Sequence, residues 1–135
     1  MGMADIRLAL ESHLNDLTGL PDIAWENVHY EPVEGTSYIR TELQMQWERP
    51  ASMGPDSLVL RKGIFILSIF TPKNEGKQEA DQIGDLLVSH FHLQTLQNGL
   101  YPVRTSYAER RAPIEWKTWD VSNLVISFYC YDSPL

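Results

Sequence analysis

Apolar side chains along this chain follow two spacings, one typical of strands and one typical of helices. Residues 58–60 and 63–70 are apolar at both odd and even positions. Neither face of such a strand can be left fully to water, because successive side chains point to opposite faces of a sheet. We therefore predict that residues 58–70 form the central strand of a sheet.

Two segments repeat apolar residues every three or four positions, as an amphipathic helix does. The first covers residues 3–17 and is followed by Gly19 and Pro21, which are typical of a helix end. The second covers roughly residues 75–90 and follows the central strand through Thr71-Pro72. Each helix has one apolar face to bury, and the sheet is the nearest surface for it.

The remaining apolar segments, residues 23–30, 38–47, 101–107 and 119–131, have the composition or alternation of strands. In the second of them, alternation places Ile39, Leu43, Met45 and Trp47 on one face. The order αβββαββ predicts an α+β fold, in which two helices pack on one face of a sheet of four to five strands. We expect a mostly antiparallel sheet, or a mixed one if the second helix joins parallel strands.

The connection at residues 48–57 contains two prolines, a glycine and few residues to bury. This composition predicts a mobile loop, of the kind that often orders when it meets a partner. The 135 residues otherwise suit a single domain, from 1 to 135, with a core of its own.

Net charge, cysteine content and the lack of long apolar runs limit the kinds of function that the protein can have. Eleven Lys and Arg against 18 Asp and Glu give a net charge of −7, which repels phosphate backbones. The single cysteine, Cys130, can form no internal disulfide and is interpreted as a core residue. No run of 18 apolar residues and no signal peptide are present, so we expect a soluble protein made in the cytoplasm, with no membrane partner.

The sheet predicted here has more apolar surface than two short helices can cover. The central and last strands are apolar on both faces, so we expect another subunit or partner to hide the remainder. Aromatic residues at strand positions are either core residues or interface anchors, and arginines could accompany them at an interface. The residues that we expect at a subunit or partner interface are Trp25, Tyr38, Arg40 and Arg110.

No catalytic motif is found in the sequence. It contains no glycine-rich phosphate loop, no nucleophile elbow, no CxxC pair and no His-Glu-x-x-His. His90 and His92 are two residues apart, so on a helix they diverge. Asp81 is interpreted as part of a solvated helix face, and Glu26 has no second acid or base beside it. We therefore expect no enzyme activity, no cofactor and no metal.

The order of short motifs along the chain is more informative than any one of them. The motifs are Ile6-Arg7 with Leu10 and Leu14, Gly19-Leu20-Pro21, Ala24-Trp25-Glu26-Asn27, Tyr30-x-Pro32, Gly35-x-x-Tyr38-Ile39-Arg40, Gly63-Ile64-Phe65, Thr71-Pro72, Gly76, the helix through Ala80, Ile83 and Phe91, and Val103. From about Ile6 to Tyr131, this order resembles the small tail-terminator and minor-tail proteins of long-tailed phages. The sequence departs from that pattern around Met45-Gln46-Trp47, where a shorter strand end is expected.

The resemblance implies a non-enzymatic virion protein that assembles in the host cytoplasm and resides in the virion tail. It implies a ring, expected to be a hexamer, that caps the tail tube, ends its polymerisation and offers a surface for head joining. The implied partners are further copies of the chain, the tube protein and a head-completion protein, while DNA passes through the lumen without specific binding. For contact with the tube we expect the loop residues Arg49, Met53 and Asp56.

Two other functions remain open at this point. The first is a head-completion or neck protein of the head–tail connector, which also needs self-association and protein docking. The second, from a different class, is a small metal-dependent hydrolase that uses Glu26, Asp81 or the His90/His92 pair.

Overall fold

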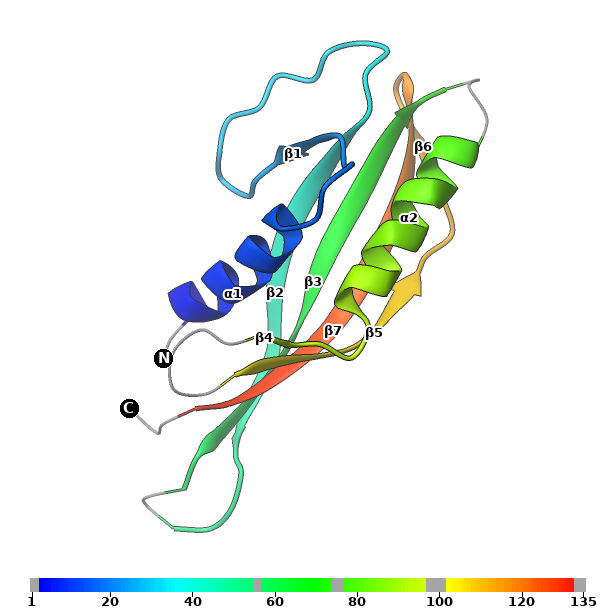
Figure 1. Ribbon diagram of the computed structural model, residues 1–135. Coiled ribbons are helices and arrows are strands. Elements are labelled where there is room, and N and C mark those ends of the chain that lie inside the picture. The colour runs from blue at the N-terminus through cyan, green and yellow to red at the C-terminus, as the bar shows by residue number, and fades with distance from the viewer. Residues whose placement is uncertain (1–2, 55–56, 74–76, 97–101, 133–135) are drawn as a thin grey trace.

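The computed structural model describes residues 3–54, 57–73, 77–96 and 102–132, and in them two helices lie against one face of a long, curled sheet (Figure 1). In chain order the elements are α1 (Met3–Asn15), β1 (Asp22–Ala24), β2 (Tyr38–Pro50), β3 (Val59–Pro72), α2 (Gln78–Phe91), β4 (Thr95–Leu96), β5 (Val103–Arg110), β6 (Ile114–Trp116) and β7 (Trp119–Asp132). Asp56, residue 75 and Tyr101, which figure in the expectations above, lie outside the described residues.

The sheet of the described residues has seven strands, in the order β1-β2-β3-β7-β5-β4, with β6 pairing the end of β7. The β1–β2 pair is parallel and the other pairs are antiparallel. The fold is α+β, but the predicted sheet of four to five strands with the order αβββαββ is wrong. The additional strands β4 and β6 have two and three residues, which is too short for an alternating pattern to reveal them.

The first strand is also much shorter than residues 23–30. Only Asp22–Ala24 pair with β2, and the chain then turns, with the N–H of Val28 donating to the carbonyl of Trp25 at 3.1 Å. Asn27 adopts a φ of 62°, in the left-handed region that ends regular strand geometry. Residues 25–36 therefore form an irregular segment beside the start of β2.

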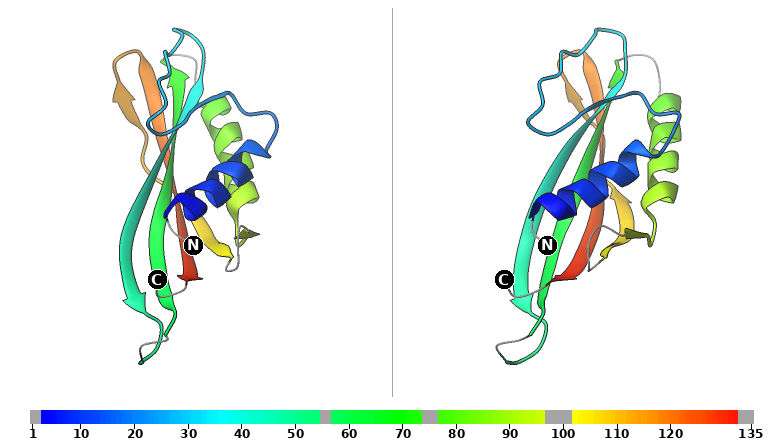
Figure 2. Two further views of the ribbon diagram at one scale, coloured as in Figure 1. Left: turned by 90° about the vertical axis from the view of Figure 1, so that its left-hand side faces the viewer. Right: turned by 60° about the vertical axis from the view of Figure 1, so that its left-hand side comes forward.

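The main core lies between the two helices and the sheet, and both helices lie on the same side in the two views of Figure 2. Leu10 and Leu14 of α1 and Leu87 and Phe91 of α2 are fully buried there. A fully buried side chain of this size contributes about 1.5–3 kcal/mol relative to an exposed one. Gly63 on β3 has no room for a side chain, because a Cβ would lie 2.8 Å from the ring of Phe128.

The opposite side of the sheet is here called the open face, and the described residues cover it only at one end. There Tyr38, Phe70, Trp119 and Val121 form a second buried cluster, against which Tyr30 packs. Further along the strands, neither helix of the described residues covers this side, and its apolar residues Ile64, Ile66 and Tyr129 are half-buried. Strands β3 and β7 are therefore apolar on both faces for two reasons. One face packs in the main core, and the other forms the partly uncovered open face.

A bulge in β2 changes the face to which its second half points. Met45 pairs with Gly63, whereas Trp47 pairs with the adjacent residue Lys62, so Gln46 is the additional residue. Because one inserted residue reverses the alternation, Trp47 lies on the open face. The prediction that Trp47 shares a face with Ile39 and Leu43 is wrong for this reason.

The connection between β2 and β3 is a hairpin end that extends beyond the helices (Figure 1). The strands continue to Pro50 and resume at Val59, so pairing reaches further into residues 48–57 than the sequence indicated. Within the described part of the turn, the N–H of Ala51 donates to the carbonyl of Leu58 at 2.7 Å. The side chain of Met53 is fully exposed.

Candidate functional site

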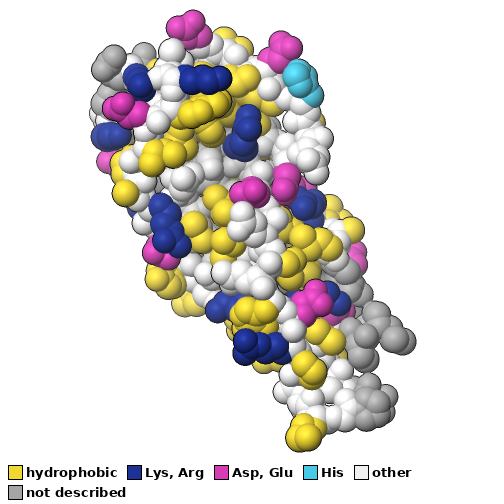
Figure 3. All heavy atoms as spheres, turned by 180° about the vertical axis from the view of Figure 1, so that it is seen from behind, with side chains coloured by type: hydrophobic (Ala, Val, Ile, Leu, Met, Phe, Trp, Pro, Cys, Tyr) yellow, Lys and Arg dark blue, Asp and Glu magenta, His cyan; other side chains and the backbone are white. Residues whose placement is uncertain are grey.

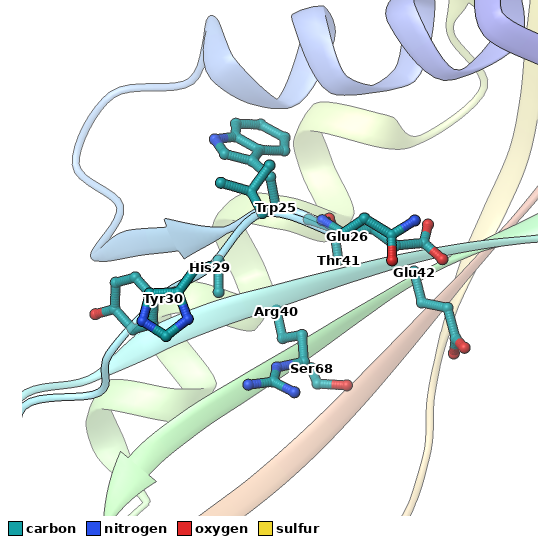
Figure 4. A pocket seen from close by; sticks show the side chains of 11 residues that line it. Trp25, Glu26, His29, Tyr30, Arg40, Thr41, Glu42 and Ser68 are labelled. Carbon is teal, nitrogen blue, oxygen red and sulfur yellow. The ribbon is translucent and has the colours of Figure 1, made fainter.

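An open pocket of about 440 Å³ lies at the β1 edge of the sheet. Residues 24–30 form one wall, and Arg40, Thr41 and Glu42 of β2 with Ser68 of β3 form the other. Figure 4 shows Trp25 on the helix side of β2, and Arg40 and Ser68 on the opposite side. The polar side chains therefore reach the pocket from different directions and do not converge on one point.

Glu26 connects three parts of the chain within this pocket. Its Oε1 accepts hydrogen bonds from Arg7 Nη1 of α1 at 2.5 Å and from the backbone N–H of Leu43 at 3.0 Å. Its own N–H donates to Thr41 Oγ1 at 3.2 Å. Glu26 therefore holds α1 and the irregular segment against the outer edge of β2, where that N–H of Leu43 faces away from β3.

The protonation state of Glu26 follows from these contacts. Burial acts to raise the pKa of its carboxyl group, but the hydrogen bonds from Arg7 and Leu43 outweigh burial and hold the pKa below 4.5. The carboxylate is thus ionised at neutral pH, and its Oε1 atom already accepts two hydrogen bonds. Such a group is suited to anchoring the fold and poorly suited to general-base chemistry.

Tyr38 and Arg40 are neighbours of this pocket with different exposures. Tyr38 is fully buried and stacks on Phe70 with a ring-centroid distance of 4.5 Å. Burial raises the pKa of Tyr38, and the positive charge of Arg40 opposes part of that shift. Arg40 is exposed on the open face, with its guanidinium 5.9 Å from the ring centroid of Phe70. Arg40 can therefore contact a partner directly. Tyr38 is buried and can only pack beneath the surface residues.

Trp25 and Arg110, the other two expected interface residues, lie apart from each other. Trp25 is half-buried and packs against the main core beside Ile23. Arg110, at the end of β5, forms an ion pair with Asp85 of α2, and its guanidinium lies over Gly84. The four residues therefore do not form one cluster. Their role at an interface stays a prediction.

The histidines of the hydrolase hypothesis have other roles in the structure. His90 stacks on His13 of α1 with ring centroids 3.8 Å apart and an angle of 7° between the rings. His13 Nε2 donates to the carbonyl of His90 at 2.6 Å, and His90 Nε2 donates to the carbonyl of His13 at 2.5 Å. This reciprocal pair fastens the end of α1 to the end of α2, while His92 is exposed.

The described residues contain no group of three or more His, Cys, Asp or Glu side chains arranged to hold a metal ion. Cys130 is buried in the core, and burial raises the pKa of its thiol to about 11, so the nucleophilic thiolate is scarce at neutral pH. No helix in the described residues has the length and apolar character needed to cross a membrane.

Two features of the site could not be found from sequence reasoning. The partner of Glu26, Arg7, is 19 residues away, and the partner of His90 is 77 residues away. No local spacing signals either contact, because both depend on how the helices cross the sheet. Of the expected tube-contacting residues, Arg49 is exposed over the ring of Trp47 at 4.4 Å and Met53 is exposed at the hairpin end.

The fold and the pocket together are those of a structural α+β protein, in which Glu26, His90 and Arg110 form contacts between elements. A family model described as phage tail terminator protein matches residues 5–122. The chain belongs to the phage tail terminator family, and it is a structural component of a phage tail.

Comparison with solved structures supports the fold alone. One solved structure is similar to this chain, with a TM-score of 0.74 at 22% sequence identity. The alignment covers 98% of this chain and 96% of that one. No curated protein matches the sequence.

Proposed function

We propose that this protein caps the tail tube as a ring, ends tube polymerisation and provides the surface to which the head is joined. The observation that carries the proposal is membership of the tail terminator family over residues 5–122. A non-enzymatic role fits the site, in which Glu26 and His90 are engaged in contacts between structural elements.

Strand edges suitable for ring contacts exist at both ends of the strand order, beside β2 and beside β5. On one side, β1 pairs only with Tyr38, Ile39 and Arg40, so the rest of β2 has no strand beside its outer edge among the described residues. On the other side, β4 pairs only with Val103 and Arg104 of β5. A ring needs two different surfaces that meet head to tail, and open strand edges together with uncovered apolar surface are suitable for this.

Within this proposal, Trp25, Arg40 and Arg110 are the interface residues that a neighbouring subunit can touch directly. Tyr38 is fully buried, so its truncation would destabilise the monomer and give an ambiguous result. The informative variant is therefore the triple change Trp25→Ala, Arg40→Ala and Arg110→Ala. Unchanged oligomerisation and tail assembly in this variant would exclude these residues from the interface.

The decisive experiment is deletion of the gene from a phage that carries it, followed by electron microscopy of the particles. Loss of the protein should give overlong tails that lack heads, and expression from a plasmid should restore tails of normal length. Tails of normal length beside filled heads that leak DNA would instead favour a neck protein of the head–tail connector. The mass of the purified protein in solution, alone and with tube protein, would show when the ring forms.

The charge of the chain suits passage of DNA through such a ring. The net charge of −7 disfavours binding of the phosphate backbone, which lets DNA move through a lumen without adhering. The ring is expected to be a hexamer, with the tube protein on one face and a head-completion protein on the other.

A further inference from the structure

A row of alternating aromatic and basic residues crosses the open face. Trp47 of β2 pairs with Lys62 of β3, Lys62 pairs with Tyr129 of β7, and Tyr129 pairs with Arg104 of β5. Paired residues in adjacent strands project to the same side, so these four side chains form one line, here called the basic row. With strands about 4.8 Å apart, the basic row is about 14 Å long.

The position of the basic row on the open face follows from its neighbours. Phe128 and Cys130, on either side of Tyr129, are buried in the core, so Tyr129 points away from the helices. The bulge at Gln46 brings Trp47 to the same side. Figure 3 views this side of the molecule and shows Lys and Arg side chains beside hydrophobic ones over its lower half.

Within the described part of the chain, no ion pair engages the cations of the basic row. Among the described residues, neither Lys62 nor Arg104 forms an ion pair, and the next cross-strand line, Arg49, Leu60 and Tyr131, contains no acid. Arg49 stacks on Trp47 and adds a third positive charge. Trp, Tyr and Arg are the residues that contribute most to binding where proteins meet, so the composition is that of an interface.

A surface of complementary character lies on the irregular segment that follows β1. Residues 28–34, here called the acidic segment, contain Glu31 and Glu34 as their acids and no Lys or Arg. Their apolar residues Val28 and Val33 are 61% and 60% exposed. Tyr30 anchors the acidic segment at the start of β2, where its ring lies 5.1 Å from that of Tyr38.

The two surfaces of one chain are too far apart to meet. Tyr38 and Trp47 are separated by nine residues of β2, which correspond to about 30 Å along a strand. A second copy, however, offers the missing surface to each of them, and association through two different surfaces is the kind that generates a ring when the rotation closes.

We propose that the basic row of one copy receives the acidic segment of the next copy, with Lys62 and Arg104 facing Glu31 and Glu34. Trp47 and Tyr129 would cover Val28 and Val33. This assignment rests on the proposed function, because it names the contact through which the ring closes. Because exposed charges are screened by salt, the contact weakens as ionic strength rises.

The test uses two charge-reversal variants of the full chain. The row variant carries Lys62→Glu and Arg104→Glu, and the segment variant carries Glu31→Lys and Glu34→Lys. Each pairs like charges across the contact, so each alone should associate at least about tenfold more weakly than wild type in sedimentation velocity. A 1:1 mixture should regain wild-type association, because row and segment are again of opposite charge at every contact. The chain carrying all four changes should regain it as well.

Controls separate this contact from general effects of charge. A variant with Lys77→Glu and Lys117→Glu changes the net charge as the row variant does and should associate like wild type. Circular dichroism of each variant checks that the fold is intact, and the same variants are tested for rescue of the phage that lacks the gene.

The outcomes that overturn the proposal are distinct from failure of the proposed function. Wild-type association by both variants, or loss of association that the mixture does not restore, would overturn the contact. A wild-type chain that stays monomeric, both alone and on tails, would also overturn the contact. The same holds if wild type binds duplex DNA and the row variant loses this binding while its association is unchanged. Restoration in the mixture with a mass of only two copies would keep the contact and remove the ring. Tails of normal length in the phage that lacks the gene would exclude the terminator role, but they would not contradict the contact between copies.

Discussion

At the scale of single residues, Glu26 links α1, the irregular segment of residues 25–36 and the edge of β2 through one carboxylate. We expect Glu26→Gln to lower the free energy of unfolding by about 1–3 kcal/mol, because the charged hydrogen bond from Arg7 is weakened. Urea denaturation at pH 7 measures this change. Glu42→Gln, the same change at an exposed position on β2, is the matched control and should stay within about 0.5 kcal/mol of wild type.

The same pair of variants gives a prediction for pH. The folded-state pKa of Glu26 is below 4.5, so its stabilising contribution is complete above pH 4.5 and is lost as the pH falls through the folded-state pKa. The difference in stability between wild type and Glu26→Gln should therefore shrink in acid. A difference that stays constant from pH 7 to pH 3 would contradict the role given to this carboxylate.

The stacked histidines give a second pH prediction. Burial and the proximity of His90 hold the pKa of His13 below 6.5, although its hydrogen bond to His90 and the charge of Asp16 act in the other direction. The stabilising contribution of neutral His13 is therefore complete above pH 6.5, and it is lost as the pH falls through the lowered folded-state pKa of His13. His13→Phe keeps a ring in the stack and removes this titration.

Thermal unfolding measured at pH 8 and pH 5 tests this role of His13. His13→Phe should be somewhat less stable than wild type at pH 8, because a hydrogen bond is lost, and should lose less stability on acidification. The exposed His92→Phe is the control and should follow wild type at both pH values. A wild-type acid response in His13→Phe would assign the sensitivity to other groups.

At the scale of elements, the sequence was most informative where a pattern was long. The two helices and the long strands β3 and β7 have many residues in one spacing, and they lie close to the predicted positions. The short strands β4 and β6 pair through tertiary position alone, and residues 25–30 leave strand geometry because of a turn at Asn27. Alternation also failed at Gln46, because a bulge is specified by the partner strand and has no signature in the residues themselves.

The β2–β3 hairpin end gives the prediction at this scale. Replacing residues 51–58 with a two-residue Asn-Gly turn would remove exposed Met53 while keeping the paired strands. If the hairpin end contacts the tube, ring formation should be unchanged and tails should become overlong in electron micrographs. Tails of normal length would refute this contact. Met53→Ser alone, which keeps the hairpin length, shows whether the apolar side chain is required.

At the scale of the whole molecule, the sequence predicted that part of the sheet is left for another chain to cover, and the open face is the surface in question. The candidate site was harder to predict from the sequence. Glu26 was recognised as unusual, but its partners Arg7 and Leu43 come from elements that only the fold brings together. Tyr38, expected at an interface, is buried because its ring packs among those of Tyr30, Phe70 and Trp119.

The bulge at Gln46 also has a genetic consequence. Loss of that one codon would place Trp47 directly after Met45 and still opposite Lys62, so the residues from Trp47 to the hairpin end would keep their pairing with β3 and their faces. An in-frame deletion of three nucleotides would thus change the bend and twist of the β2–β3 hairpin, while the side chains on each of its faces stay the same. Relatives that lack this residue would present the same outward side chains at a different angle to a common framework.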